Sequence, residues 1–234
     1  PEFISWLYEG NGLKLYQKMY DDGKFNVHVV PCSISAPETA GWFKNEIKSK
    51  EDLKGLKMRF YGLGGEVMSK LGASVSLIPG GEIFSALEKG VIDATEFSSP
   101  VVDQLLGFHK IAKYNYFPGW HQQATIFELL INNKTWNNMS NQQRSAVEMT
   151  CKANLVTSLA ESEAAQGPAI ERNISERGVI VKQWSPELLQ EFKGAWGEAL
   201  VDLRKNKNFD AVWTDLEKFR KDYSYWNKNG FLPR

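Results

Sequence analysis

The feature that most constrains the fold of this chain is an alternation of strand-like and helix-like segments in its first half. Short runs of β-branched and apolar residues are separated by segments with helical apolar spacing. The strand-like runs are Lys57–Tyr61, Ser74–Ile78 and Ala94–Phe97, and the helical segments between them are 64–71 and 82–88. Such alternation is typical of βαβ units, in which helices connect parallel strands. The sequence therefore predicts an α/β fold whose sheet is mostly parallel in this region.

Long helices are predicted for the second half of the chain. Helical spacing runs from residue 140 to 176, starts at a capping box of Ser140 and Gln143, and is expected to kink at Gly167-Pro168. Further helices are predicted over 13–20, 49–56, 100–112 and 209–226, and another begins at residue 185. Further strands are predicted over 25–30, where Pro31 ends the strand, and over 126–131 and 179–181. The long helices do not fit a simple doubly wound sheet, so we expect them to run as struts across a two-lobed body.

Composition excludes some classes of partner. The chain has 234 residues, with 28 basic and 28 acidic side chains, so its formal net charge is zero. This balance argues against nucleic acid or an anionic membrane as the main partner. No apolar run approaches the roughly 18 residues that a membrane-spanning helix requires.

The two cysteines, Cys32 and Cys151, have no CxxC spacing. A disulfide between them is possible, but their distance in space does not follow from the sequence. We expect free, buried thiols, which leaves the redox compartment open.

Arg59 is a single cation in the apolar, strand-like run that precedes a glycine-rich turn. A strand buries alternate side chains, and a buried guanidinium needs an anionic partner. Arginine also matches the shape of a carboxylate, which it binds with two parallel hydrogen bonds. The anion is either another side chain of the protein or a ligand.

The turn after this strand reads Gly62-Leu63-Gly64-Gly65 and opens a helix. It resembles a dinucleotide-binding loop, but Val67 stands where the third glycine of GxGxxG is required. A helix N-terminus that presents N–H groups to a small anion is the better interpretation.

Other polar residues are candidates for a site. Glu38 is expected in a loop and Glu96 at a strand end, and oxygen ligands of this kind suit hard cations. The histidines His28, His109 and His121 lack metal-ligand spacing, so structural or surface roles are expected for them, with His28 on the exposed side of a strand. No nucleophile elbow, Ser–Lys pair or kinase signature is present.

Three blocks of sequence carry a family resemblance. Residues 51–59 read EDLKGLKMR, residues 79–96 read PGGEIFSALEKGVIDATE, and residues 116–121 read YFPGWH, with matching Pro31-Cys32 and Gly41-Trp42-Phe43 upstream. In this order they resemble the solute-binding proteins of tripartite ATP-independent periplasmic (TRAP) transporters. The resemblance covers most of the chain from about Leu13 onward and is greatest to the branch that binds 2-oxo acids or related small monocarboxylates with a metal ion.

The resemblance implies a role for individual residues. Arg59 would grip the ligand carboxylate, Glu38 would contact both the ligand and the metal ion, and Glu96 would hold the metal ion. The remaining implied contacts are Gln122 to ligand and metal, Trp120 as an apolar wall, and Phe97 as both an apolar wall and a backbone metal ligand.

The chain departs from the family pattern at two of these positions. Glu38 stands where sodium-using members are expected to have glutamine, and Gln122 stands where glutamate is common. Arg59 with a monovalent ion gives a charge of +2, against −3 from Glu38, Glu96 and a monocarboxylate. A divalent ion would balance the site, so Ca²⁺ is at least as suitable as Na⁺. The alternative is that positions 38 and 122 have exchanged identities, with a different geometry.

The resemblance also implies an organisation and a setting. It predicts an α/β, bilobal fold like that of type II periplasmic binding proteins. In this fold, residues 1–30 would be a remnant of the first lobe and crossover, 31–95 the second α/β lobe, 96–134 the crossover and return strands, and 135–234 long helices that brace both lobes. We expect a periplasmic, non-enzymatic receptor, truncated at its N-terminus, that delivers a small organic acid to TRAP membrane subunits. A homodimer through Trp213, Phe219, Tyr223 and Trp226 is possible. The competing classes are a metal-assisted enzyme acting on a carboxylic acid and a ligand sensor.

Overall fold

The computed structural model describes residues 1–232 of the chain. Its contacts divide these residues into two compact units. Unit 1 comprises 1–31, 128–151 and the chain from 200 onward, and unit 2 comprises 32–127 and 152–199. In the described part of the chain, no helix combines the length and apolar character needed to cross a membrane.

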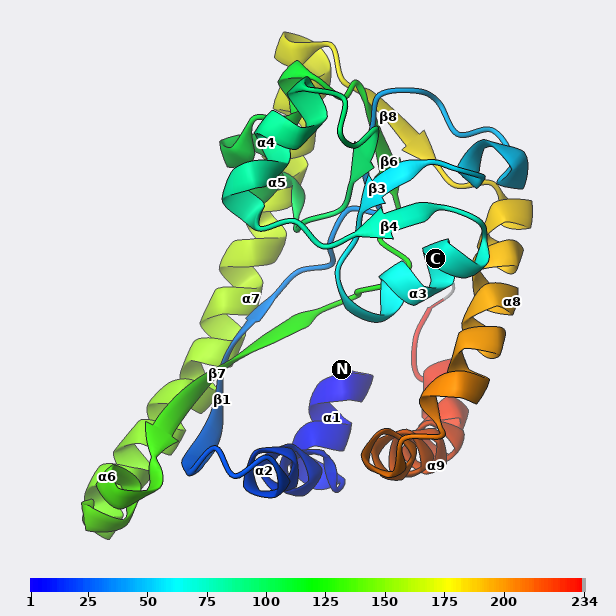
Figure 1. Ribbon diagram of the computed structural model, residues 1–234. Helices are drawn as coiled ribbons and strands as arrows, with labels where there is room; N and C mark the ends of the chain where they lie inside the picture. The colour runs from blue at the N-terminus through cyan, green and yellow to red at the C-terminus, as the bar shows by residue number, and fades with distance from the viewer. Residues whose placement is uncertain (233–234) are drawn as a thin grey trace. The chain divides into compact units, whose positions relative to one another are not determined.

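A six-stranded mixed sheet forms the centre of unit 2, in the order β4-β3-β5-β2-β6-β8 (Figure 1). Its strands are β2 (Gly41–Phe43), β3 (Lys57–Arg59), β4 (Ser74–Ser76), β5 (Ala94–Thr95), β6 (Tyr114–Phe117) and β8 (Ile180–Gln183). β3 is parallel to both β4 and β5, as the alternation over 57–97 predicts. β2 runs antiparallel to β5 and β6, and β6 is parallel to β8.

Helices cover both faces of this sheet. Figure 1 shows α4 (Gly80–Glu88) and α5 (Pro100–Leu106) on one side, and α3 (Gly62–Lys70) with α8 (Pro186–Leu203) on the other. Trp42 and Phe43 are adjacent in β2 and therefore point to opposite faces. Trp42 belongs to the apolar cluster beneath α4, and Phe43 belongs to the cluster beneath α3 and α8. Unit 2 therefore has two cores, one on each face of the sheet.

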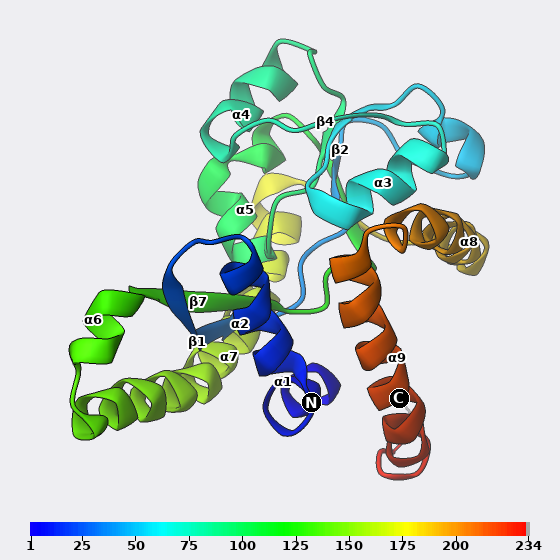
Figure 2. The same cartoon turned by 60° about the horizontal axis from the view of Figure 1, so that its bottom comes forward.

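Unit 1 is mainly helical. It contains α1 (Glu2–Glu9), α2 (Gly12–Asp22), α6 (Asn133–Asn138), the start of α7 (Asn141–Arg177) and α9 (Lys207–Asn229). Figure 2 shows the short connection by which α6 leads into α7, and the capping box of Ser140 and Gln143 forms there as predicted. Trp6 Nε1 donates to Asp215 at 2.8 Å, which joins α1 to α9. A two-stranded sheet pairs β1 (Val27–Ser35) with β7 (Thr125–Asn132).

Several predicted elements need correction. Pro31 does not end the first strand, since β1 continues to Ser35, and a proline without an N–H group is tolerated in a two-stranded sheet. The predicted helix 100–112 is broken at Gly107, which has a φ of 76° and separates α5 from the 3₁₀ turn η2 (Phe108–Lys110). The predicted helix 49–56 is the shorter 3₁₀ turn η1 (Lys50–Leu53). The extent of the predicted helix 140–176 needs no such correction, because it matches α7, in which Pro168 lies.

The expectation of free thiols is wrong. Both Cys32 and Cys151 are disulfide-bonded. The two cysteines are far apart in sequence, and sequence separation alone carried no information about their distance in space. Disulfides persist mainly in oxidising compartments, which fits a protein that works outside the cytosol.

Candidate ligand and metal site

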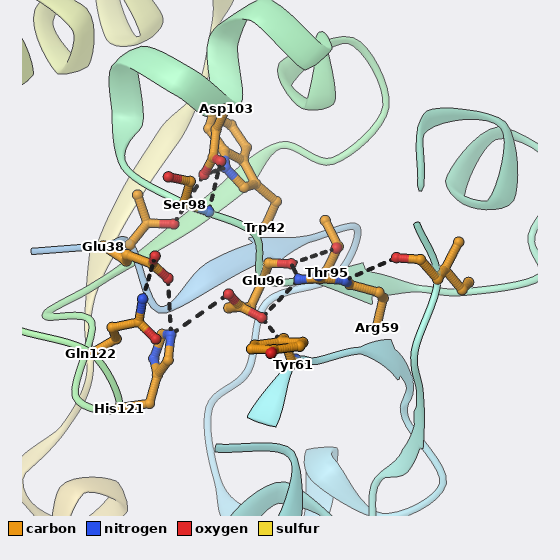
Figure 3. Close-up of polar contacts among 12 residues, drawn as sticks. Glu38, Trp42, Arg59, Tyr61, Thr95, Glu96, Ser98, Asp103, His121 and Gln122 are labelled. Carbon is orange, nitrogen blue, oxygen red and sulfur yellow. Dashed lines mark hydrogen bonds and ion pairs between the residues drawn. The ribbon is translucent and has the colours of Figure 1, made fainter. Parts of the chain in front are cut away.

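The connectivity of the sheet brings four polar segments to one edge of unit 2. β3 and β5 are parallel, so both end at this edge, with Arg59 paired to Thr95. β2 is antiparallel to β5 and β6, so the segment before β2 meets the segments that follow the other two strands. Glu38 lies before β2, Glu96 follows β5, and the turn 118–123 follows β6. Residues that are far apart in the chain therefore converge here (Figure 3).

Arg59 is buried at the end of β3, with 6% of its surface exposed. Its NH1 group donates to Glu96 Oε2 at 2.9 Å and also to the Glu96 carbonyl oxygen, and its Nε donates to the Ile78 carbonyl at 3.3 Å. The guanidinium lies 5.3 Å from the centre of the Phe97 ring. The anion that meets Arg59 in the structure is therefore the side chain of Glu96.

Glu96 is held from two sides. Its Oε2 accepts both the Arg59 bond and the backbone N–H of Tyr61 at 3.0 Å, and its Oε1 lies 3.8 Å from His121 Nε2. Tyr61 is the residue before α3, so the predicted anion at this helix N-terminus is a carboxylate of the protein itself. Burial alone would raise the pKa of Glu96, but His121, the Tyr61 N–H and the Arg59 charge outweigh it and lower the pKa.

Glu38 is the second buried carboxylate of the site, with 7% of its surface exposed. Its Oε1 accepts a bond from Gln122 Nε2 at 2.7 Å, and its Oε2 lies 3.4 Å from His121 Nε2. Burial raises the pKa of Glu38, and the charge of Glu96 adds to this effect. The pKa values of Glu38 and Glu96 thus move in opposite directions, as expected for two carboxyl groups that share a small buried space.

His121 is the residue that sequence reasoning missed. Its side chain is only 4% exposed and its Nε2 faces both Glu38 and Glu96, so of the two expected roles, structural or surface, the surface role is wrong. Its ring packs edge-on against Phe60, with 4.9 Å between ring centres. Burial alone would lower the pKa of His121, but its contacts with Glu38 and Glu96 raise it. The one hint in the sequence is that His121 lies directly before the predicted site residue Gln122.

The donor set fits a bound cation. Glu38, Glu96 and His121 each offer a ligand atom, and these atoms lie within 4.8 Å of one another. An ion that bonds oxygen at roughly 2.4 Å can hold two ligands up to about twice that distance apart. Two carboxylates suit hard ions such as Ca²⁺ or Na⁺, and the imidazole nitrogen is the softer member of the set.

The other predicted site residues lie close by. Gln122 Nε2 also donates to Thr125 Oγ1, and the Glu38 N–H donates to the Gln122 carbonyl at 3.2 Å. Trp120 is partly buried, and its ring stacks on Phe192 with 4.7 Å between ring centres. The structure therefore brings together Arg59, Glu96 and Phe97 as one group and Glu38, His121 and Gln122 as a second, with His121 in contact with both carboxylates.

Comparisons with known proteins identify the family of this chain. The family model for bacterial extracellular solute-binding protein, family 7, matches residues 8–206, so the chain belongs to this family. A curated relative from Nostoc sp., named as a monocarboxylate 2-oxoacid-binding periplasmic protein, is 38% identical over 226 residues. The match covers 96% of this chain and 61% of the relative, so the chain spans less than two thirds of that protein.

Solved structures of TRAP solute-binding proteins have the same fold. One from Bordetella bronchiseptica, a mixed-occupancy dimer with calcium and picolinate in one site, has a TM-score of 0.90 and 33% identity, and the match covers 97% of this chain and 67% of that one. One from Pseudoalteromonas atlantica with sodium and pyruvate has a TM-score of 0.89 and 31% identity, over 97% and 69%. One from Colwellia psychrerythraea with calcium and pyruvate has a TM-score of 0.88 and 32% identity, over 98% and 70%. The predicted TRAP resemblance and the type II periplasmic-binding fold are confirmed.

Proposed function

We propose that this protein is a periplasmic receptor that binds a small 2-oxo or 2-hydroxy monocarboxylate together with Ca²⁺ or Na⁺ and delivers it to TRAP membrane subunits. The observation that carries the proposal is the buried group of Arg59, Glu96, Glu38 and His121 at one edge of the sheet. This group combines a guanidinium that already binds a carboxylate with a donor set that suits a cation. Three relatives of known structure hold a carboxylate and a metal ion.

Arg59 would bind the ligand carboxylate. Its present partner Glu96 demonstrates that a carboxylate fits against NH1, at 2.9 Å in a buried position. A ligand carboxylate would share or take over this position, while Glu96 turns an oxygen toward the metal ion. The exchange keeps the guanidinium paired, which a buried charge requires.

His121 changes the charge balance of the site. A protonated His121 with Arg59 would neutralise Glu38 and Glu96, so a monocarboxylate would then need one further positive charge, as from Na⁺. With a neutral His121 the same sum requires Ca²⁺. Ca²⁺ thus balances the site when His121 is neutral and Na⁺ balances it when His121 is protonated, so the proposal includes both ions.

The competing functions predict different results. An enzyme would use the metal ion as a Lewis acid and convert its carboxylic acid, so recovery of the acid unchanged after long incubation argues for a receptor. A sensor would share the fold and bind the same acid, and genes for a kinase instead of TRAP membrane subunits beside its own gene would favour it. The family to which the chain belongs is one of solute-binding proteins, which supports the receptor.

The proposed setting of the protein is the periplasm. The family is extracellular, and the disulfide-bonded cysteines fit a periplasmic location. The four-part division of the chain at residues 30, 95 and 134 into remnant, lobe, crossover and bracing helices remains part of the proposal. So does a homodimer through the aromatic residues of α9, where Trp226 is 59% exposed. Light scattering with a Trp226→Ser variant would test the dimer.

Calorimetry tests the proposed function. Pyruvate, lactate, malonate and an uncharged ester of pyruvate would be titrated into the protein in Na⁺ buffer, in Ca²⁺ buffer, and in choline buffer with a chelator. We expect pyruvate or lactate to bind only when a metal ion is present, and the ester not to bind. Equal binding with and without the metal ions, or binding of the ester, would refute the proposal.

A further inference from the structure

Asp103 is a fully buried carboxylate behind the ligand site. It lies in α5, and none of its surface is exposed. Its Oδ1 accepts the backbone N–H of Ser98 at 3.0 Å. Its Oδ2 accepts Trp42 Nε1 at 2.8 Å and the hydroxyl of Thr39 at 3.3 Å. All three donors belong to the two segments that carry the carboxylates of the site (Figure 3).

These contacts join the chain around Glu38 to the chain around Glu96. Thr39 directly follows Glu38, and Ser98 comes two residues after Glu96. The segments also meet directly, because the Thr39 N–H donates to the Ser98 carbonyl at 3.0 Å. Asp103 thus bridges the start of β2 and the stretch after β5 at the point from which Glu38 and Glu96 extend.

We propose that Asp103 is a positioning residue, which sets the spacing of Glu38 and Glu96 and thereby the affinity of the site for a metal ion and its carboxylate ligand. The metal-binding part of this inference rests on the proposed function. The positioning part does not, since it concerns only where Asp103 holds Thr39 and Ser98.

The chemistry of the position favours a carboxylate. Three donors converge on two oxygen atoms, and each oxygen has to accept. An asparagine offers one accepting oxygen, and its NH₂ group would face either the Ser98 N–H or the donors of Trp42 and Thr39. A buried donor without an acceptor is unfavourable, so an amide would force one segment away from the other. Residues that orient metal ligands in this way commonly change metal affinity by about 10- to 100-fold when replaced.

The experiment compares three variants with the parent. Asp103→Asn removes an acceptor from the bridge, and Thr39→Val removes one donor while keeping the shape of the side chain. Asp52→Asn is the matched control, because Asp52 also accepts two backbone N–H groups, from Lys48 and Ser49, but lies in η1 away from the site. Circular dichroism verifies that each variant is folded at the temperature of measurement.

Two readouts separate positioning from general stability. Calorimetry measures the affinity for Ca²⁺ alone and for pyruvate in Ca²⁺ buffer. NMR at a fixed pH and without metal follows the ring signals of His121, which faces Glu38 and Glu96, with the rings of His28 and His109 as internal references. We expect Asp103→Asn to weaken both affinities at least tenfold, Thr39→Val to weaken them by less, and both to shift the His121 signals. Asp52→Asn should lower only the melting temperature.

The outcomes are decisive in each case. The inference would be overturned if Thr39→Val, and Asp103→Asn if it folds, kept affinities within twofold of the parent and left the His121 signals unmoved. If Asp103→Asn does not fold, Thr39→Val alone decides. If the parent binds neither Ca²⁺ nor pyruvate, the proposed function fails, and the His121 signals still decide whether Asp103 positions the site.

Discussion

Single residues define what the site can bind. Arg59 is buried and paired with Glu96, as expected if its role is a structural salt bridge. The same pair lies beside a donor set suited to a metal ion, as expected if its role is ligand binding. The two interpretations are compatible, because a carboxylate that holds an arginine can be exchanged for the carboxylate of a ligand. Substitution of Arg59 separates a structural role from a binding role.

Arg59→Ala is expected to weaken pyruvate binding by about 2–5 kcal/mol, the range for removing one partner from a buried, hydrogen-bonded charge pair. Calorimetry in Ca²⁺ buffer measures this change, after circular dichroism has verified folding. Arg177→Ala is the control, because Arg177 makes hydrogen bonds to Gln104 and Asn173 away from the site and should leave pyruvate binding unchanged. A folded Arg59→Ala protein with the affinity of the parent would contradict the role of Arg59.

Glu38 and Gln122 are expected to act as one exchangeable pair. Gln122 Nε2 lies 2.7 Å from Glu38 Oε1, so swapping the two residues keeps one carboxylate and one amide in the same place. Glu38→Gln alone should weaken Ca²⁺ binding about tenfold or more, whereas the double variant Glu38→Gln/Gln122→Glu should recover most of the loss. A double-mutant cycle by calorimetry measures the recovery, and purely additive losses would show that the two positions are not equivalent.

The raised pKa of Asp103 leads us to expect that the free energy of unfolding depends on pH. Burial raises the pKa of Asp103 to about 7, and the charges of Glu38 and Glu96 contribute, while its bonds from Trp42 and Thr39 oppose the shift. A carboxyl group with a raised pKa in the folded state stabilises the fold fully below its unfolded pKa of about 4, and this contribution is lost as the pH rises through about 7.

The free energy of unfolding should therefore fall more between pH 4 and 8 in the parent than in Asp103→Asn, by at most about 4 kcal/mol. Urea unfolding at several pH values measures both slopes. Glu38, with its own raised pKa, is present in both proteins, so the difference between the slopes reports the loss of the Asp103 carboxyl group together with any change in the pKa of Glu38 that follows from it. Parallel curves would mean that Asp103 keeps an ordinary pKa.

The sequence alone predicted the involvement of some of these residues in the site but not that of others. Arg59 was found from its place in an apolar run, and Glu38 and Glu96 from the family motifs beside them. His121 was missed because isolated histidines carry no spacing signal, and its role depends on two carboxylates far away in the chain. Asp103 was missed because its three donors come from β2, from the segment before it and from the segment after β5.

At the scale of elements, the periodicity of apolar residues predicted those helices and strands that are defined by a continuous stretch of the chain. The β3–α3–β4–α4–β5 alternation and the long helices α7 and α9 were predicted within a few residues of their ends, and for α8 only the start was predicted. The short strands β2 and β6 were not predicted, since three or four residues show no usable alternation. Their antiparallel pairing is nevertheless what brings Glu38 to the turn after β6. Strand pairing depends on tertiary contacts, which a single sequence does not display.

The turn after β6 packs closely against the segment before β2, and Gly119 makes this approach possible. A Cβ atom at Gly119 would lie 2.1 Å from the Glu38 carbonyl oxygen and 2.7 Å from its carbonyl carbon. Both atoms are backbone, so the segment itself would have to move. Gly119→Ala should therefore lower the melting temperature by several degrees and weaken Ca²⁺ and pyruvate binding at least tenfold.

Gly167→Ala is the control for this substitution. Gly167 lies inside α7, and a Cβ atom there would meet nothing within 4 Å, so alanine should stabilise the helix by about 0.5–1 kcal/mol. Scanning calorimetry and ligand titration on both variants check the contrast. Normal binding by Gly119→Ala would show that the two segments need not approach this closely.

At the scale of the whole molecule, the chain has the architecture of its family. The match to the Nostoc relative covers 96% of this chain and 61% of that protein. The fold itself is established by solved relatives with TM-scores of 0.88 to 0.90. The sequence could predict this architecture because the three motif blocks occur in the family's order along the chain.

The most direct test of the central claim is a crystal structure of the protein grown with Ca²⁺ and pyruvate. The account predicts one ion bonded by oxygens of both Glu38 and Glu96 at roughly 2.3–2.6 Å, and the pyruvate carboxylate on the guanidinium of Arg59. Anomalous scattering would identify the ion. Pyruvate bound away from Arg59, or an ion that contacts neither glutamate, would contradict it.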